Sequence, residues 1–173
     1  MHRNARIDLH RRLAEGYHEA YKRRVERGGV IYPPEWRLTD DAIYWSSYFG
    51  TAPLKQFHNR SGASQSDSAS REAVVYAVKL PDFAPVEFMC WPSEEGAAWR
   101  SRFVGHTTDG KEMGFWAADF ILTNEDGLIT RWETFVDSDE FGDVLELCTG
   151  VRGPFRDFYK YRAELDRVIA AGQ

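Results

Sequence analysis

The sequence predicts an α+β fold in which a mainly antiparallel sheet packs against helices. Apolar residues follow helical spacing at both ends of the chain, whereas four segments between residues 86 and 137 have the composition of strands joined by short turns. Strands that follow one another directly form antiparallel sheets, rather than the parallel sheets of alternating strand and helix units. At 173 residues the chain is long enough for one domain with a real core, so we expect a single domain over residues 1–173.

The strongest local signal is a hairpin between residues 112 and 137. Its two arms, rich in aromatic and β-branched residues, flank Asn124-Glu125-Asp126-Gly127. There Asn favours a type I turn, and Gly favours the left-handed position that closes it. Counting from a four-residue loop predicts two faces. One face carries Trp116, Ala118, Phe120, Glu133, Phe135 and Asp137. The other carries Ala117, Asp119, Ile121, Thr130, Trp132, Thr134 and Val136.

The remaining elements follow from periodicity and from the placement of Gly and Pro. Before the hairpin we expect a helix ending at Gly28, a strand over residues 40–49, a short helix over residues 71–79, and strands over residues 86–91 and 98–107. After the hairpin we expect a helix with Phe141, Val144, Leu145 and Cys148 on one face. An additional C-terminal helix, which Pro154 opens, should follow within residues 150–173. The valines of residues 71–79 could also support a strand. The Ser-rich segment 61–70 predicts a mobile loop and is a candidate lid.

Composition argues against several classes of protein. The formal net charge of -5 argues against a general nucleic-acid binder, which would present a basic field. The basic residues of the first helix, Arg24 among them, alternate with acids, which favours a solvated helix face. No segment approaches the ~20 apolar residues that cross a bilayer. Cys90 and Cys148 match neither a disulfide framework nor a zinc spacing, so we expect a cytoplasmic protein without a nucleic-acid or membrane partner.

Several short motifs stand in the second half of the chain: Thr107-Thr108-Asp109-Gly110-Lys111, Asp119-Phe120, Asp126-Gly127-Leu128-Ile129, Trp132 and Phe135-Val136-Asp137. Together they resemble the SnoaL-like, nuclear-transport-factor-two-like superfamily over residues 98–148; the first helix and residues 40–45 resemble it weakly. The resemblance implies a cone in which a strongly curved sheet wraps N-terminal helices around an apolar pocket. Members include polyketide cyclases, ketosteroid isomerases, scytalone dehydratase, limonene epoxide hydrolase, a diarylpropane lyase and noncatalytic binding proteins. The resemblance therefore indicates the fold and leaves the chemistry open.

Arg102 and Asp137 are the first candidates for catalysis. If Arg102 faces inward, its planar, permanently charged guanidinium could hold a phenolate, enolate or carboxylate; a surface arginine is the alternative. Asp137 ends the last strand among aromatic residues, where desolvation would raise the pKa of its carboxyl group and suit it to acid/base work. Capping of the following helix is the alternative role. Residues 100–102 read Arg-Ser-Arg, not the Arg-x-Asp pair of limonene epoxide hydrolase, so we expect no water-activating dyad of that kind.

The surplus of aromatic residues indicates a pocket. Tyr44 and His58 are further catalytic candidates, because a buried phenol can donate to an oxyanion and an imidazole can move a proton near neutral pH. Most buried tyrosines, however, are structural. The residues expected to bind substrate are Tyr17, Trp45, Tyr48, Phe88, Trp91, Trp116, Phe120 and Phe135. Five of them should line one cavity together with Arg102: Trp45, Trp91, Trp116, Phe120 and Phe135. The sequence has no metal-ligand spacing, phosphate loop, nucleophile elbow or dinucleotide motif, so we expect neither metal nor cofactor.

The residues and the resemblance together favour a cofactor-independent lyase or dehydratase that acts by acid/base chemistry on an aromatic, phenolic small molecule. The specific version is a diarylpropane lyase-like or scytalone dehydratase-like enzyme, for example one that deformylates diarylpropanes in lignin-derived aromatic catabolism. A polyketide cyclase-like or ketosteroid isomerase-like enzyme is one alternative. A noncatalytic small-molecule-binding protein of the same fold is the other.

The second hairpin face is too apolar to stay in water if the helices occupy the first. We therefore expect a homodimer or homotrimer. Its contact should be made by Ala117, Ile121, Thr130, Trp132, Thr134 and Val136.

Overall fold

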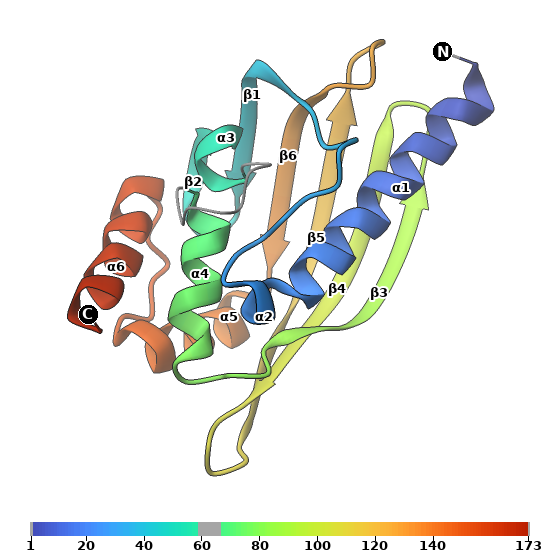
Figure 1. Cartoon of the computed structure of the whole chain (residues 1–173). Helices are drawn as coiled ribbons and strands as arrows, with labels where there is room; N and C mark the ends of the chain where they lie inside the picture. Colours follow the sequence, from blue (N-terminus) through green and yellow to red (C-terminus); the bar gives the residue numbers. More distant parts are fainter. Residues whose placement is uncertain (1, 59–66, 173) are drawn as a thin grey trace.

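The computed structural model describes residues 2–58 and 67–172 and shows an α+β fold built on a six-stranded sheet (Figure 1). The strands are β1 (Leu38–Ser46), β2 (Gly50–Pro53), β3 (Ala84–Pro92), β4 (Gly96–His106), β5 (Glu112–Thr123) and β6 (Ile129–Val136). Their order is β2-β1-β6-β5-β4-β3, and only β1 and β6 are parallel neighbours. The sheet is curved and unclosed, with β2 and β3 as its edges. The predicted class and mainly antiparallel sheet are confirmed.

Helices cover one face of this sheet (Figure 1). They are α1 (Arg3–Lys22), α2 (Arg24–Arg27), α3 (Leu54–Phe57), α4 (Ser68–Ala77), α5 (Ser138–Thr149) and α6 (Phe158–Ala171). Helix α1 packs along β3 and β4, and α6 packs mainly against α4. Within residues 2–58 and 67–172, no helix combines the length and the apolar character needed to cross a bilayer.

The register of the central hairpin differs by two residues from the count for a four-residue loop, because Ile121 pairs with Trp132 instead of Thr130 and the register shifts between Leu122 and Thr123. Asn124 closes the turn, because its carbonyl oxygen accepts from Gly127 N and its side-chain oxygen accepts from Asp126 N and Leu128 N. Gly127 has a φ of 77°, the left-handed conformation expected of it. Across the strands Ala118 pairs with Phe135, and Asp119 pairs with Thr134. A shift of two residues leaves each side chain on its predicted face, so the two faces are confirmed for residues 117–121 and 132–136, whereas Thr130 falls at the register shift.

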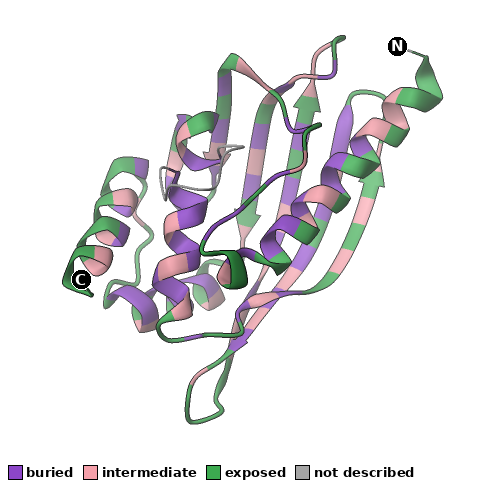
Figure 2. Ribbon diagram, viewed as in Figure 1, coloured by how far each residue is buried: buried purple, intermediate pink, exposed green. Residues whose placement is uncertain are grey.

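The prediction of which face is covered by a partner subunit is wrong. The face with Ala117, Asp119 and Trp132 is the inner face, buried beneath the chain's own helices (Figure 2). Small side chains on this face, such as Ala117 and Ser101, leave room for the helices to approach. The face with Phe120 and its neighbours turns outward instead. Residues chosen as a subunit contact are thus part of the core of one chain.

Several boundaries differ from the predicted ones. The predicted strand over residues 40–49 ends earlier, at Ser46 in β1, and residues 47–49 form the turn into β2, which pairs back with β1 at the edge of the sheet. Helix α4 confirms the helical alternative for residues 71–79, but it begins at Ser68, where Asp67 caps it by accepting from Ser70 N. Residues 61–66 of the predicted loop and lid lie outside the described residues. Helix α6 begins at Phe158 because Asp157 caps it, four residues after Pro154.

Candidate active site

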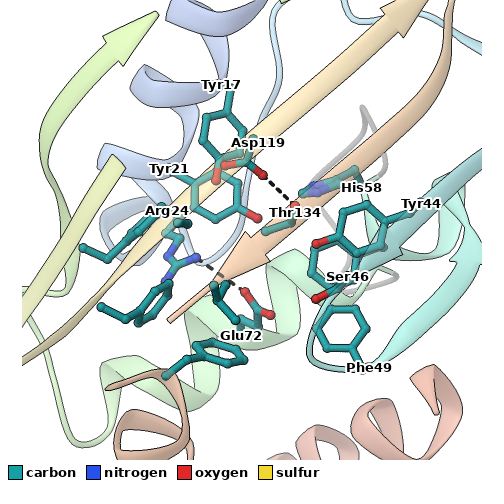
Figure 3. A pocket seen from close by; sticks show the side chains of 16 residues that line it. Tyr17, Tyr21, Arg24, Tyr44, Ser46, Phe49, His58, Glu72, Asp119 and Thr134 are labelled. Atoms are coloured by element: carbon teal, nitrogen blue, oxygen red, sulfur yellow. Dashed lines mark hydrogen bonds and ion pairs between the residues drawn. The ribbon is translucent and has the colours of Figure 1, made fainter. Parts of the chain in front are cut away.

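A pocket lies between the concave face of the sheet and the helices α1, α2 and α4 (Figure 3). The free space between its walls, with the open mouth included, is about 410 Å³. The lining residues are Tyr17, Tyr21, Arg24, Tyr44, Ser46, Phe49, Phe57, His58, Glu72, Phe103, Phe115, Ala117, Asp119, Thr134, Val136 and Phe141. The walls are mainly aromatic, and the charged groups fall into two places: Asp119, and the pair Arg24 and Glu72.

Asp119 is a fully buried carboxyl group in the wall of this pocket. Its Oδ1 accepts hydrogen bonds from Trp132 Nε1 at 2.8 Å and from Thr134 Oγ1 at 2.5 Å. The indole N–H of Trp99 faces the same carboxyl group without completing a hydrogen bond, and Oδ2 has no partner among the described residues. Burial raises the pKa of Asp119 to about 6, against the opposing effect of the hydrogen bonds from Thr134 and Trp132. At neutral pH the group is therefore mostly ionised.

Tyr17 and Tyr44 line the same pocket as Asp119 (Figure 3). The ring of Tyr17, on α1, lies 5.1 Å from the ring of Trp132, and the ring of Tyr44, on β1, stacks on Phe57 at 4.1 Å. Burial raises the pKa of both phenols well above the ordinary value, and the charge of Asp119 adds to this rise. Both hydroxyl groups therefore stay protonated and can donate hydrogen bonds.

His58 follows α3 and completes the polar wall beside Asp119. Its ring stacks on Trp132, with centroids 3.7 Å apart and planes 8° from parallel. Its Nδ1 shares a hydrogen bond with the Tyr32 hydroxyl, whereas its Nε2 has no partner among the described residues. Burial lowers the pKa of His58 well below the ordinary value, so the imidazole is neutral at physiological pH.

The second charged place pairs Arg24 of α2 with Glu72 of α4. Both side chains are buried, and Arg24 Nη1 lies 3.6 Å from Glu72 Oε2. The solvated helix face expected for the basic residues of the first helix is thus wrong for Arg24. On α2, the Arg24 side chain points into the interior of the protein and lies among aromatic rings.

Three predicted site residues line this pocket: Tyr17, Tyr44 and His58. Arg102 does not, because alternation on β4 places it on the outer face, where Nη1 pairs with Glu140 Oε2 at 2.5 Å. Asp137 does not either. It caps α5 by accepting from Asp139 N and Glu140 N, the alternative weighed for it from the sequence.

The predicted common cavity around Arg102 is wrong. The five aromatic residues assigned to it lie on the outer face of the sheet, and three of them are at least 43% exposed: Trp91, Phe120 and Phe135. The other two, Trp45 and Trp116, are half-buried on the same face. The physical reason is that the sheet buries the face that packs better against the helices. The opposite face then points to solvent, even though it is rich in aromatic residues.

The remaining two predicted binding residues have structural contacts. Tyr48 is buried, packs against Phe141 at 4.6 Å, and donates its hydroxyl hydrogen to the Arg152 carbonyl oxygen. Phe88 is half-buried on β3 and packs against His18 of α1 at 4.7 Å. Neither side chain lines the pocket.

Asp119, Arg24 and Glu72 are site residues that the sequence pattern does not single out. A lone acid on an otherwise apolar strand face, beside the small residue Ala117, is the sequence signal that could have identified Asp119. No such signal marks Arg24 or Glu72, because their burial depends on how α2, α4 and the sheet pack together. Among the described residues, no three His, Cys, Asp or Glu side chains gather as a metal-ligand cluster.

No protein-family profile and no curated protein matches the chain. Solved structures do resemble it in fold. A proposed SnoaL-like polyketide cyclase from Jannaschia is 12% identical, with 84% of this chain and 92% of that chain covered and a TM-score of 0.48. A steroid delta-isomerase from Pseudomonas aeruginosa is 16% identical, with 92% and 93% covered and a TM-score of 0.45. A protein with a ketosteroid isomerase-like fold from Catenulispora acidiphila is 12% identical, with 80% and 92% covered and a TM-score of 0.46. These descriptions fall within the superfamily that the sequence motifs resemble, and none of them assigns a function to this chain.

Proposed function

We propose that the protein is a cofactor-independent acid/base enzyme that isomerises or cyclises a small carbonyl compound, with Asp119 as the general base. The observation that carries this proposal is a fully buried carboxyl group in an aromatic pocket, with one oxygen that has no hydrogen-bond partner among the described residues. A pKa of about 6 keeps most of the group ionised at neutral pH while leaving it basic enough to accept a proton.

The reaction would begin when Asp119 Oδ2 removes a proton from the carbon next to the substrate carbonyl. The electron pair of the broken C–H bond moves onto the carbonyl oxygen and gives an enolate. The hydroxyl of Tyr17 or Tyr44 donates a hydrogen bond to that oxygen, which stabilises the developing charge within the aromatic pocket. His58, held by its stacking on Trp132, fixes the indole that orients the Asp119 carboxylate.

Two outcomes follow from the enolate. In an isomerisation, Asp119 returns the proton to a different carbon of the conjugated system. In a cyclisation, the enolate carbon forms a bond to a second carbonyl carbon of the same molecule, and the oxygen of that carbonyl takes the proton. Atoms and electrons balance in both cases without an oxidant or a reductant.

The pocket supports these reactions better than the diarylpropane lyase version. That version relied on Arg102 and Asp137 acting inside the pocket, and both lie outside it. An aromatic substrate stays within the proposal, since rings such as Tyr17, Tyr44 and Phe115 line the cavity. Noncatalytic binding of a small molecule is the competing function.

Proton exchange in heavy water tests the proposal. Unsaturated ketones, β-diketones and hydroxylated polycyclic ketones are incubated with the protein, and deuterium at the carbon beside the carbonyl is followed by NMR. Wild type should exchange at least about 100-fold faster than Asp119→Asn, because the amide cannot accept the proton. Asp126→Asn, on the exposed turn of the same hairpin, is the matched control and should behave as wild type.

The pH dependence gives a second criterion. Since the base acts when deprotonated, kcat/KM should fall as the pH drops below the Asp119 pKa of about 6, and should level off above it. Exchange that persists in Asp119→Asn would refute the assignment of the base. Ketones that bind without any exchange would favour the noncatalytic function.

A further inference from the structure

The second charged region of the pocket is an arginine within a cage of aromatic rings. Arg24 is 1% exposed, and its guanidinium carbon lies 4.7 Å from the ring centroid of Tyr21, 5.0 Å from that of Phe83 and 5.4 Å from that of Tyr76. Phe103 completes the cage at 5.7 Å. Ring faces attract the cation, but they cannot accept the hydrogen bonds that its N–H groups donate in the guanidinium plane.

The N–H groups of Arg24 are poorly satisfied. Nη1 lies 3.6 Å from Glu72 Oε2, farther than a charge-assisted hydrogen bond reaches. Nε and Nη2 are buried and have no hydrogen-bond partner among residues 2–58 and 67–172. Buried charged groups in folded proteins are normally hydrogen-bonded, because leaving them without partners costs free energy. Since Arg24 also lines the pocket, the arrangement points to an acceptor that arrives with the ligand.

Glu72 is not a strong permanent partner for this cation. Its Oε1 already accepts a hydrogen bond from the Tyr161 hydroxyl. Burial raises the pKa of Glu72 to about 7, although Arg24 and the Tyr161 hydrogen bond lower it. The titratable groups that act on Glu72 and on its phenol neighbours come from several elements: Tyr21 of α1, Arg24 of α2, Asp67 and Tyr76 at α4, Asp119 of β5, Cys148 of α5 and Tyr161 of α6. Among them Asp67 repels the Glu72 charge, so a further anion would favour the protonated form.

We infer that Arg24 binds a carboxylate group of the substrate, and that Glu72 takes up a proton when this carboxylate binds. The inference rests on the proposed function and deepens it, since it makes the substrate a carbonyl compound that also carries a carboxylate. The planar guanidinium fork matches the two oxygens of a carboxylate. Glu72, once neutral, keeps its hydrogen bond to Tyr161 and stops repelling the ligand.

The two polar regions of the pocket lie on different elements. Tyr17 lies on α1 and Arg24 on α2, after the break at Arg23. Tyr21 lies between them in the sequence, with its ring against Arg24 (Figure 3). The carbonyl and the carboxylate should therefore lie on separate parts of the substrate.

Calorimetric titration with 3-phenylpropionate tests the inference without any turnover, and 3-phenylpropionamide is the neutral matched probe. Wild type should bind the acid at least about tenfold more tightly than the amide. At a pH of about 8, binding should take up nearly one proton, which titrations in two buffers of different ionisation enthalpy measure. At a pH of about 6 the uptake should be close to zero, since Glu72 is then already protonated.

Two variants separate the roles of the pair. Glu72→Gln removes the competing charge but keeps a partner for Tyr161. At a pH of about 8 it should bind the acid about tenfold more tightly than wild type does, because that pH is about one unit above the Glu72 pKa and ligand binding no longer requires protonation. Arg24→Met keeps the length of the side chain without its charge, and should abolish the preference for the acid over the amide.

Three results would overturn the inference: equal binding of acid and amide, no binding of the acid up to about 10 mM, or no tightening in Glu72→Gln. If Arg24→Met does not fold, the Glu72→Gln titration decides alone. If wild type binds the acid with the expected proton uptake but catalyses no proton exchange on any of the ketones, the proposed function alone is refuted.

Discussion

Replacing Asp119 with asparagine should make the folded protein more stable at neutral pH, although it removes the proposed base. Burial raises the pKa of this carboxyl group from its ordinary value of 3.8 to about 6. Keeping the ionised group buried therefore costs the folded state about 3 kcal/mol above the pKa. The asparagine oxygen can still accept from Trp132 and Thr134, so the two existing hydrogen bonds survive. For a chain of this length, about 3 kcal/mol corresponds to a rise in Tm of about 6 to 12 °C.

The pH dependence distinguishes this effect from a general gain in packing. A carboxyl group whose pKa is raised on folding holds its proton more tightly in the folded state. The free energy of unfolding of the wild type therefore falls as the pH rises from about 4 to about 6, and this contribution is constant above that range. Asp119→Asn lacks the titrating group, so its advantage should be small at a pH of about 4 and full at a pH of about 7.

Urea unfolding followed by tryptophan fluorescence across this pH range measures the difference. Glu72 titrates alike in both proteins, so its effect cancels in the comparison. Asp126→Asn, an exposed change on the same hairpin, should show a difference near zero at every pH. An Asp119→Asn variant that is less stable than wild type at neutral pH, or an advantage that does not change with pH, would refute the reasoning.

Three further outcomes are expected. Tyr17→Phe should lower kcat at least about tenfold with little change in Tm, because it removes one donor to the enolate oxygen; an unchanged kcat in steady-state kinetics would leave Tyr44 as the donor. Arg102→Ala should lower the free energy of unfolding by about 1 kcal/mol or less, since its ion pair with Glu140 is partly exposed, and should leave the pH profile of kcat/KM unchanged. The homodimer or homotrimer remains a prediction, now through the outer sheet face, and Phe120→Glu should dissociate it in light scattering; a wild-type mass near 19.9 kDa would contradict this prediction.

Alternation made it possible to predict which residues share a face of the central hairpin, but not which face points inward. The turn chemistry of Asn124 and Gly127 locates the hairpin, whereas the register shift between Leu122 and Thr123 moves the pairing by two residues from the count and leaves the faces unchanged. Both faces, however, carry aromatic residues, so composition alone does not say which one packs against helices. The buried small side chains of Ala117 and Ser101 favour the inward face, because they leave room for helices such as α1, which packs along β4.

The candidate site was predictable only where its residues are aromatic or are histidine. Residue type alone predicts three of the pocket residues as candidates, namely Tyr17, Tyr44 and His58. The fold places them in the same pocket as Asp119. Arg24 and Glu72 resemble ordinary surface charges of a helix in the sequence. Their burial follows from three-dimensional packing between elements about 50 residues apart, which no local pattern encodes.

The first turn of α5 mechanically connects the outside of the sheet to the inside of the pocket. Glu140 faces outward, where it accepts from Arg102 and from Trp116 N, and the next residue, Phe141, faces inward as part of the pocket wall. Because adjacent residues of one rigid turn move together, a displacement of Glu140 carries Phe141 with it. Anything that contacts the outer face around Arg102 would then alter the width of the cavity, and so change KM before it changes kcat. A ligand that pushes Phe141 aside would, by the same lever, rearrange the outer face.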